Sequence, residues 1–252
     1  MRAHPVTSIT FASLAFNTTV DRGVSPEIFW EGVQKIFAYH PQLCDDKGFS
    51  LIFVQARTAL GSESGQEGRT RTALERLTYS INFNLGYTGM DIPEAETAAA
   101  SLLTELRDIG INLTAGFQHF LTFTDYSRLR AFGDSVSNSR FITRLFPREN
   151  FEGQLLAKTV GVIKDTVSAG YTVIAGGMSP TLKIAGNPDN AVNPVWRRTI
   201  MHAEAVDPLP DTWSAGELNS RHERMERWVQ PWRDVTPAGG SYLNEVSTWS
   251  AL

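Results

Sequence analysis

The chain has 252 residues, of which 42% are hydrophobic and 20% charged, enough apolar content for one large or two small globular domains. The formal net charge of −4 argues against a nucleic-acid or anionic-membrane partner, and the single cysteine, Cys44, excludes an internal disulfide. No apolar run reaches the roughly 20 residues that span a bilayer, and the first residues lack the layout of a secretory signal. We expect a soluble protein, cytoplasmic as it stands.

The first half of the chain is predicted to run strand, helix, strand, strand, helix. Residues 8–16 and 50–55 are short apolar runs typical of strands. Between them, Ser25 and the proline after it are residue types that begin a helix. That helix places apolar side chains on one stripe: Ile28, Phe29, Val33, Ile36 and Phe37. Residues 93–110 form a second amphipathic segment, with Gly110 as its C-terminal cap.

The clearest strand signal is LTYSINFNLGY, at residues 77–87. Six apolar side chains alternate strictly with residues that include Asn82 and Asn84. Such alternation predicts a strand of an antiparallel sheet that has one dry face and one polar face.

The second half repeats the same order of elements. The expected strands and helices are residues 140–146, 152–170, 171–178, 197–206 and 214–230. In the last of the strands, Ile200, His202 and Glu204 share a face. The final helix is expected to end near Pro231, and Trp228 and Trp232 are expected in the core.

These elements predict an α+β fold, in which an antiparallel sheet is covered on one side by helices and built from a duplicated strand-helix-strand-strand-helix pattern. No linker divides the chain, so residues 1–252 are expected to form a single domain. Two polar stretches, 61–71 and 179–194, are interpreted as long loops at the rim of the sheet. The uncovered face is expected to meet a partner or ligand.

Conventional catalytic signatures are missing. The segment AGGMSP, residues 175–180, lacks the lysine or third glycine of a phosphate-binding loop, and no G-x-S-x-G motif occurs. The five histidines do not show metal-ligand spacing, so no metal is expected.

Two histidines are candidates for proton transfer or binding. His202 has Glu204 two residues on, hence on the same face, and a neighbouring carboxylate favours the protonated form of a histidine. A structural cross-strand role is the alternative. His119 lies among aromatic residues in GFQHFLTF, where it could contact a substrate or simply pack at the surface.

Other polar residues are candidates for contact with a ligand. Asn82 and Asn84 could donate hydrogen bonds above the sheet, or could be solvated. Tyr242 follows the flexible pair Gly239-Gly240 on a short final strand, where its phenol could reach a reacting centre or pack under a loop.

Three segments resemble a known family. GGSYLNEV (239–246) is similar to the G-x-Y-x-N-E segment of the berberine bridge enzyme-like FAD-linked oxidoreductases. NPVWRRTIMHAEAV (193–206) resembles the strand just upstream in that family, and MRAHPVT (1–7) resembles the strand that leaves its flavin domain. The long loops and many helices of the chain resemble those of fungal family members that act in secondary metabolism.

The resemblance implies the fold of the substrate domain of vanillyl-alcohol-oxidase-type flavoproteins, without the FAD-binding domain. It implies FAD as cofactor, hydride transfer from a small molecule to the flavin, and a separate FAD-binding domain or subunit as partner. Tyr242 and Asn244 would lie near the flavin, and Tyr242 or His202 would act as the base. Asn82, Asn84 and His119 are expected on the substrate side.

Two other functions remain open at this stage. The pocket could guide a cofactor-independent cyclisation or isomerisation, or the chain could be a non-catalytic remnant. A truncated or split form of the oxidoreductase fits the same resemblance.

Overall fold

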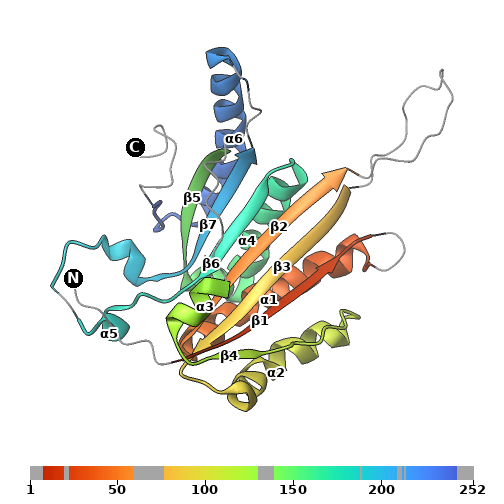
Figure 1. Ribbon diagram of the computed structural model, residues 1–252. Coiled ribbons are helices and arrows are strands. Elements are labelled where there is room, and N and C mark those ends of the chain that lie inside the picture. Colours follow the sequence, from red (N-terminus) through yellow and green to blue (C-terminus); the bar gives the residue numbers. More distant parts are fainter. Residues whose placement is uncertain are drawn as a thin grey trace.

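The computed structural model describes residues 8–19, 23–58, 77–129, 139–187, 189–208, 212 and 214–242. Within them, seven strands form one antiparallel sheet in the order β4-β1-β3-β2-β6-β7-β5 (Figure 1). In chain order the strands are β1 (Ile9–Asn17), β2 (Gly48–Thr58), β3 (Leu77–Thr88), β4 (Gln118–Phe120), β5 (Ser139–Pro147), β6 (Thr172–Gly177) and β7 (Thr199–Pro208). The expected loop at 61–71, the segment 1–7 and Asn244 lie outside the described residues.

Four long helices lie in a row along one side of the sheet (Figure 1). They are α1 (Pro26–Asp45), α2 (Ile92–Asp108), α4 (Gly153–Ser168) and α6 (Ala215–Val235). Helix α1 packs against α2 and α4, and α4 packs against α6. Shorter elements occupy the connections: α3 (Phe123–Leu129), α5 (Leu182–Ala185) and the 3₁₀ turns η1 (Arg148–Phe151) and η2 (Pro194–Arg197). The predicted α+β architecture is confirmed.

Local capping chemistry sets where the long helices begin and end. The Ser25 hydroxyl accepts a hydrogen bond from the third residue of α1. Asp91 and Ser214 each form a capping box with a glutamate three residues on, at the starts of α2 and α6. Gly110 and Gly170, which follow α2 and α4, have φ angles of +91° and +96°, a conformation that favours glycine.

The core lies between the sheet and the four long helices. The alternation predicted for β3 is observed, because Ile81, Phe83 and Leu85 are each no more than 1% exposed on the face toward the helices. Burying each such side chain stabilises the fold by about 1.5–3 kcal/mol. The hydroxyls of Tyr87 and Tyr39 lie 2.9 Å apart within this layer, and burial raises the pKa of both phenols.

The two halves of the chain show the predicted duplicated pattern. The first half runs β1-α1-β2-β3-α2 and the second runs β5-α4-β6-β7-α6, with β4 and α3 between them. The sheet order β1-β3-β2-β6-β7-β5 reads identically when the halves are exchanged, and β2 pairs antiparallel with β6 at the centre. The halves are therefore related by an approximate twofold axis between β2 and β6.

The last helix differs from the sequence expectation. Helix α6 continues through Pro231 to Val235. Trp232 is fully buried and its indole N–H lies 2.9 Å from the Thr166 hydroxyl, so tertiary packing offsets the hydrogen bond that proline cannot make. Trp228, expected in the core, is 39% exposed, although it lies one helical turn before Trp232.

Candidate functional site

The face of the sheet that points away from the four long helices is called here the open face. Side chains directly opposite one another in antiparallel strands point to the same side. The observed register therefore fixes two rows that cross the open face from β3 to β7. One row holds Asn84, Leu51, Gly176 and His202, and the next holds Asn82, Phe53, Ile174 and Glu204.

The two rows combine polar ends with an apolar middle. Asn82 and Asn84 lie on β3, and the histidine–glutamate pair lies on β7. Between them, β2 and β6 contribute only apolar side chains and one glycine. Three strand spacings of about 4.8 Å place the polar ends about 14 Å apart along the sheet. An apolar surface with a few polar groups at its rim is the usual composition of a small-molecule site.

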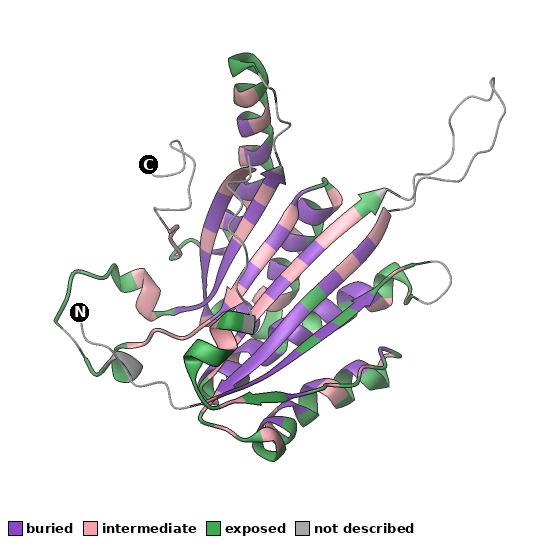
Figure 2. Ribbon diagram, in the orientation of Figure 1, coloured by how far each residue is buried: buried purple, intermediate pink, exposed green. Residues whose placement is uncertain are grey.

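None of the described long helices covers the middle of this face. Along β6, half-buried open-face residues alternate with buried residues that face the helices (Figure 2). Leu51 and Phe53 on β2 are likewise half-buried, and Asn82 is exposed. Asn84, by contrast, is only 6% exposed, so the sequence alternative of a solvated side chain does not hold for it.

One end of the open face is covered by the chain itself. Helix α3 places the Tyr126 ring 5.4 Å from that of Phe11 and 6.0 Å from that of Phe49. These two phenylalanines flank Gly86 in the next row along the sheet. The sequence analysis did not identify β4 or α3, because three- and seven-residue elements carry too little periodicity.

Three aromatic rings meet at the β7 end of the open face. The His202 ring lies 5.8 Å from the ring of Tyr242 and 5.8 Å from that of Trp196, and the latter two lie 5.5 Å apart. Nδ1 of His202 is 3.7 Å from Oε1 of Glu204. The structure thus brings both predicted catalytic residues together. Trp196 was missed, because nothing in the local pattern of η2 shows which strand it faces.

Backbone contacts with β5 hold Tyr242 in this cluster. The Leu145 amide donates a hydrogen bond to the Gly240 carbonyl at 2.7 Å, and the Tyr242 amide donates to the Thr143 hydroxyl at 3.0 Å. The Ser241 hydroxyl donates to the Thr143 carbonyl at 2.9 Å. The described residues 240–242 therefore run along the outer edge of β5, with a bridge between Gly240 and Leu145, and the rest of the expected final strand lies outside the described residues.

His119 lies elsewhere. It pairs with Thr10, which pairs with Tyr87 on the helix-facing side, so its side chain points away from the open face. Nδ1 of His119 is 2.8 Å from the Thr10 hydroxyl oxygen. Five strand spacings separate β4 from β7 in the sheet order. The structure does not bring His119 together with His202 and Tyr242.

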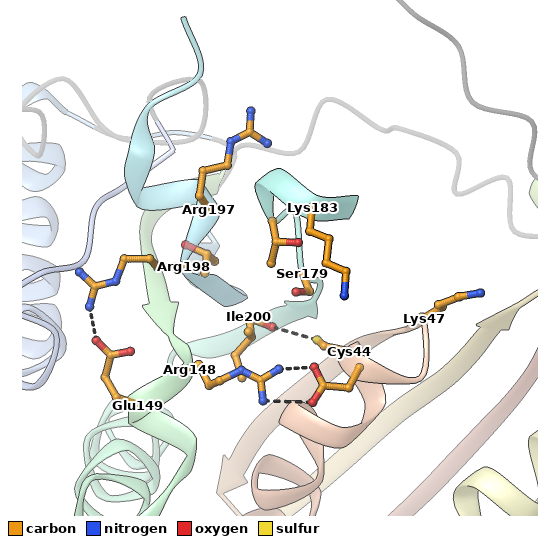
Figure 3. Close-up of a pocket in the computed structure, with 12 residues that line it drawn as sticks. Cys44, Lys47, Arg148, Glu149, Ser179, Lys183, Arg197, Arg198 and Ile200 are labelled. Atoms are coloured by element: carbon orange, nitrogen blue, oxygen red, sulfur yellow. Dashed lines mark hydrogen bonds and ion pairs between the residues drawn. The ribbon is translucent and has the colours of Figure 1, made fainter. Parts of the chain in front are cut away.

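A cavity of about 840 Å³ lies at one end of the sheet and was not identified from the sequence (Figure 3). Its lining has five basic side chains and two acidic ones: Lys47, Arg148, Lys183, Arg197 and Arg198, with Asp45 and Glu149. Two ion pairs cross-link it, Arg148 with Asp45 at 2.5 Å and Arg198 with Glu149 at 2.5 Å. The first pair connects α1 with η1, and the second connects η1 with Arg198, the residue that follows η2.

Cys44 is buried beside this cavity. Burial raises the pKa of its thiol to about 11, and its sulfur lies 4.0 Å from the Ile200 carbonyl oxygen. A neutral buried thiol is a poor nucleophile, because the thiolate is the reactive form. Among the residues that the structure describes, no three histidine, cysteine or acidic side chains gather where they could hold a metal ion. Nor does any described helix have the length and apolarity to cross a membrane.

Comparison with known proteins gives a match at the level of structure. No protein-family model and no curated protein matches the sequence. Among solved structures, a VAO-type flavoprotein from Myceliophthora thermophila C1 superposes with a TM-score of 0.76 and 18% identity, over 97% of this chain and 41% of that one.

Two further structures are similar. CrmK, a flavoenzyme involved in shunt product recycling in caerulomycin biosynthesis, has a TM-score of 0.57 and 14% identity over 96% of this chain and 47% of its own. Berberine bridge enzyme from Eschscholzia californica has a TM-score of 0.51 and 12% identity over 97% and 42%. The chain thus has the fold of the substrate domain of VAO-type and berberine bridge enzyme-like flavoproteins, and it spans less than half the length of these structures.

Proposed function

We propose that this chain is the substrate-facing part of a FAD-linked oxidoreductase that oxidises a small organic molecule, with the flavin held by a separate domain or subunit. One observation carries the proposal: nearly the whole chain superposes on less than half of each flavoprotein, and none of the described long helices covers the middle of its polar-rimmed open face. Such a surface suits contact with a planar ring presented by another part of the protein.

The continuity of the sheet supports one domain across residues 1–252. The two halves share a single seven-stranded sheet, and β2 pairs with β6 at the centre. The FAD-binding region is then a separate structural unit. This chain accordingly matches only 41–47% of the length of the flavoprotein chains.

The residues of the open face fit a flavin with a bound substrate. FAD would supply the acceptor for a hydride from the substrate. His202 and Tyr242, in ring contact with each other, would take up the substrate proton, and Tyr242 together with Asn244 would lie toward the cofactor. Asn82 and Asn84 would orient the substrate from the β3 side. A substrate contact by His119 remains a prediction that this arrangement does not use.

A role in secondary metabolism extends this proposal. Its support is the structural similarity to CrmK, whose own pathway makes caerulomycin. The long-loop, helix-rich style of the sequence, which resembles fungal family members that tailor secondary metabolites, points in the same direction.

Titration with FAD tests the proposal. We expect the protein to shift the flavin absorption spectrum and quench its fluorescence with a dissociation constant below about 1 mM. His202→Ala and Tyr242→Ala should weaken this binding, whereas His119→Ala, on the other side of the sheet, should leave it unchanged.

An unchanged flavin spectrum at saturating protein would contradict the proposal. If the protein nevertheless converted an added intermediate without FAD, the cofactor-independent cyclase or isomerase would replace the oxidoreductase as the function.

A further inference from the structure

The described strands contain four glycines: Gly48, Gly86, Gly176 and Gly177. Glycine in the interior of a strand weakens it, because the flexible residue loses more entropy on folding and offers no side chain to pack. Each of the four therefore needs a physical reason. None has the positive φ angle that would require glycine.

Packing explains three of them. A Cβ atom at Gly48 would lie 2.7 Å from the Leu43 carbonyl oxygen. A Cβ at Gly86 would overlap the Phe49 ring. At Gly177, on the helix-facing side, it would overlap the Ser50 hydroxyl and lie 2.8 Å from the His40 ring.

Gly176 has no such reason. A Cβ there would meet the terminal methyl of Met178 at 3.4 Å and two backbone oxygens at 4.0 Å, which are ordinary contacts. The residue is half-buried and stands on the open face between Leu51 and His202 in the same row. The structure has room for a Cβ atom at this position, yet the residue is glycine.

We propose that the absence of a side chain at Gly176 allows a planar conjugated ring to lie against the β6 backbone between Leu51 and His202. Glycine at a strand position without a packing role marks the close approach of a ligand. The ring would contact the apolar side chains of Leu51 and Ile174, with its polar edge toward His202. This inference rests on the proposed function and makes Gly176 the residue that limits which ring can enter.

Two sources could supply such a ring, the flavin itself or an aromatic substrate. Fluorescence titrations with riboflavin and with 2-naphthol, a planar aromatic alcohol, separate them. Both are measured on the unmodified protein, on Gly176→Ala and on Gly176→Leu. Gly161→Ala in α4 is the matched control, since a Cβ there meets nothing within 4 Å and lies far from the open face.

We expect Gly176→Ala to raise Tm by about 1–3 °C, as in the Gly161→Ala control. Ring binding should be unchanged in the control, weaker in Gly176→Ala and at least about tenfold weaker in Gly176→Leu. Gly177→Ala should instead lower Tm, because its new methyl group collides with Ser50 and His40.

Binding of riboflavin with this size dependence supports a flavin as the occupant. Size-dependent binding of 2-naphthol alone supports a substrate ring and contradicts the proposed flavin contact at this face. The inference is overturned if neither ring binds, if Gly176→Leu binds as tightly as the unmodified protein, or if Gly176→Ala lowers Tm as Gly177→Ala does.

Discussion

Residues 9–108 and 139–235 are built from the same five elements, and β3 occupies the place in the first half that β7 occupies in the second. On the helix side the two halves are alike, even to the capping boxes that begin α2 and α6. On the open face they differ. Strand β3 presents Asn82 and Asn84, whereas β7 presents His202 and Glu204.

Their surroundings differ as well. In the first half, α3 lays Tyr126 over two phenylalanines and covers one end of the face. In the second half, η2 and the C-terminal segment bring Trp196 and Tyr242 to His202. The imidazole, carboxylate and phenol groups of the open face thus lie in the second half, while the first half presents amides. The two halves therefore share an order of elements and differ in the side chains that they present on the open face.

The largest expected effect comes from the core of the second half. Trp232→Ala should lower the free energy of unfolding by about 3–5 kcal/mol, because it empties a fully buried site and leaves the Thr166 hydroxyl without its indole donor. Trp228→Ala, at a 39% exposed position, should cost much less. Urea unfolding measures both.

The shape of the same unfolding curve also bears on the comparison. Because the halves share one sheet, we expect one cooperative transition in both variants. Two separate transitions would show that the halves are independent folding units.

The next largest effect is the pH dependence of stability that arises from His40 in α1. Burial lowers its pKa from 6.5 to about 4, and its ring nitrogens lie 2.9 Å from the Ile36 carbonyl oxygen and 3.0 Å from the Ser50 hydroxyl oxygen. Between those pH values the unfolded chain binds more protons than the folded one, so stability falls as pH falls from about 6.5 to 4. This histidine should account for about 2 kcal/mol lost between pH 8 and pH 5.

His40→Gln tests the assignment by removing that part of the pH dependence in urea unfolding at pH 8, 6.5 and 5. His222, in α6 of the second half, provides a comparison. Burial also lowers its pKa, but the charge of Glu226 opposes that effect, so His222→Gln should alter the pH dependence less. Equal pH dependence in the unmodified protein and in His40→Gln would refute the role given to His40.

A change in turnover distinguishes the chemistry of the two ends of the open face. Tyr242→Phe should lower turnover of the flavin-bearing enzyme by at least about tenfold, the scale for losing one proton-transfer group. Tyr126→Phe, the matched change in the first half, should leave turnover within about twofold, because we assign Tyr126 a covering role. If turnover of Tyr242→Phe is unchanged, Tyr242 has no part in proton transfer.

The smallest expected effect is the loss of stability when the N-terminal caps of α2 and α6 are removed, a feature in which the two halves are alike. Asp91→Ala and Ser214→Ala each remove the side chain that caps a corresponding helix, and each should cost about 1 kcal/mol. Urea unfolding should give similar values for both. A cost several times larger in one of them would mean that α2 and α6 depend on their caps to different extents.

Much of the scaffold could be predicted from local pattern. The strict alternation at 77–87 identified β3, and Ser25, Gly110 and Gly170 marked helix ends within a residue or two. The shared face of His202 and Glu204 also followed from the period of a strand. These features depend on residues within about four positions of one another, so their signal is complete in a short window of sequence.

The remaining features depend on contacts that no short window contains. Thr143 holds the Tyr242 backbone although the two are 99 residues apart, and only the path of the chain along β5 brings the tyrosine to His202. The side of the sheet to which His119 points could not be predicted locally, because the pairing of β4 with β1 decides it. The sequence by itself determined the elements and their dry faces, through periodicity and capping. Tertiary structure alone decided the register, and with it which polar side chains meet and that Gly176 stands bare between Leu51 and His202.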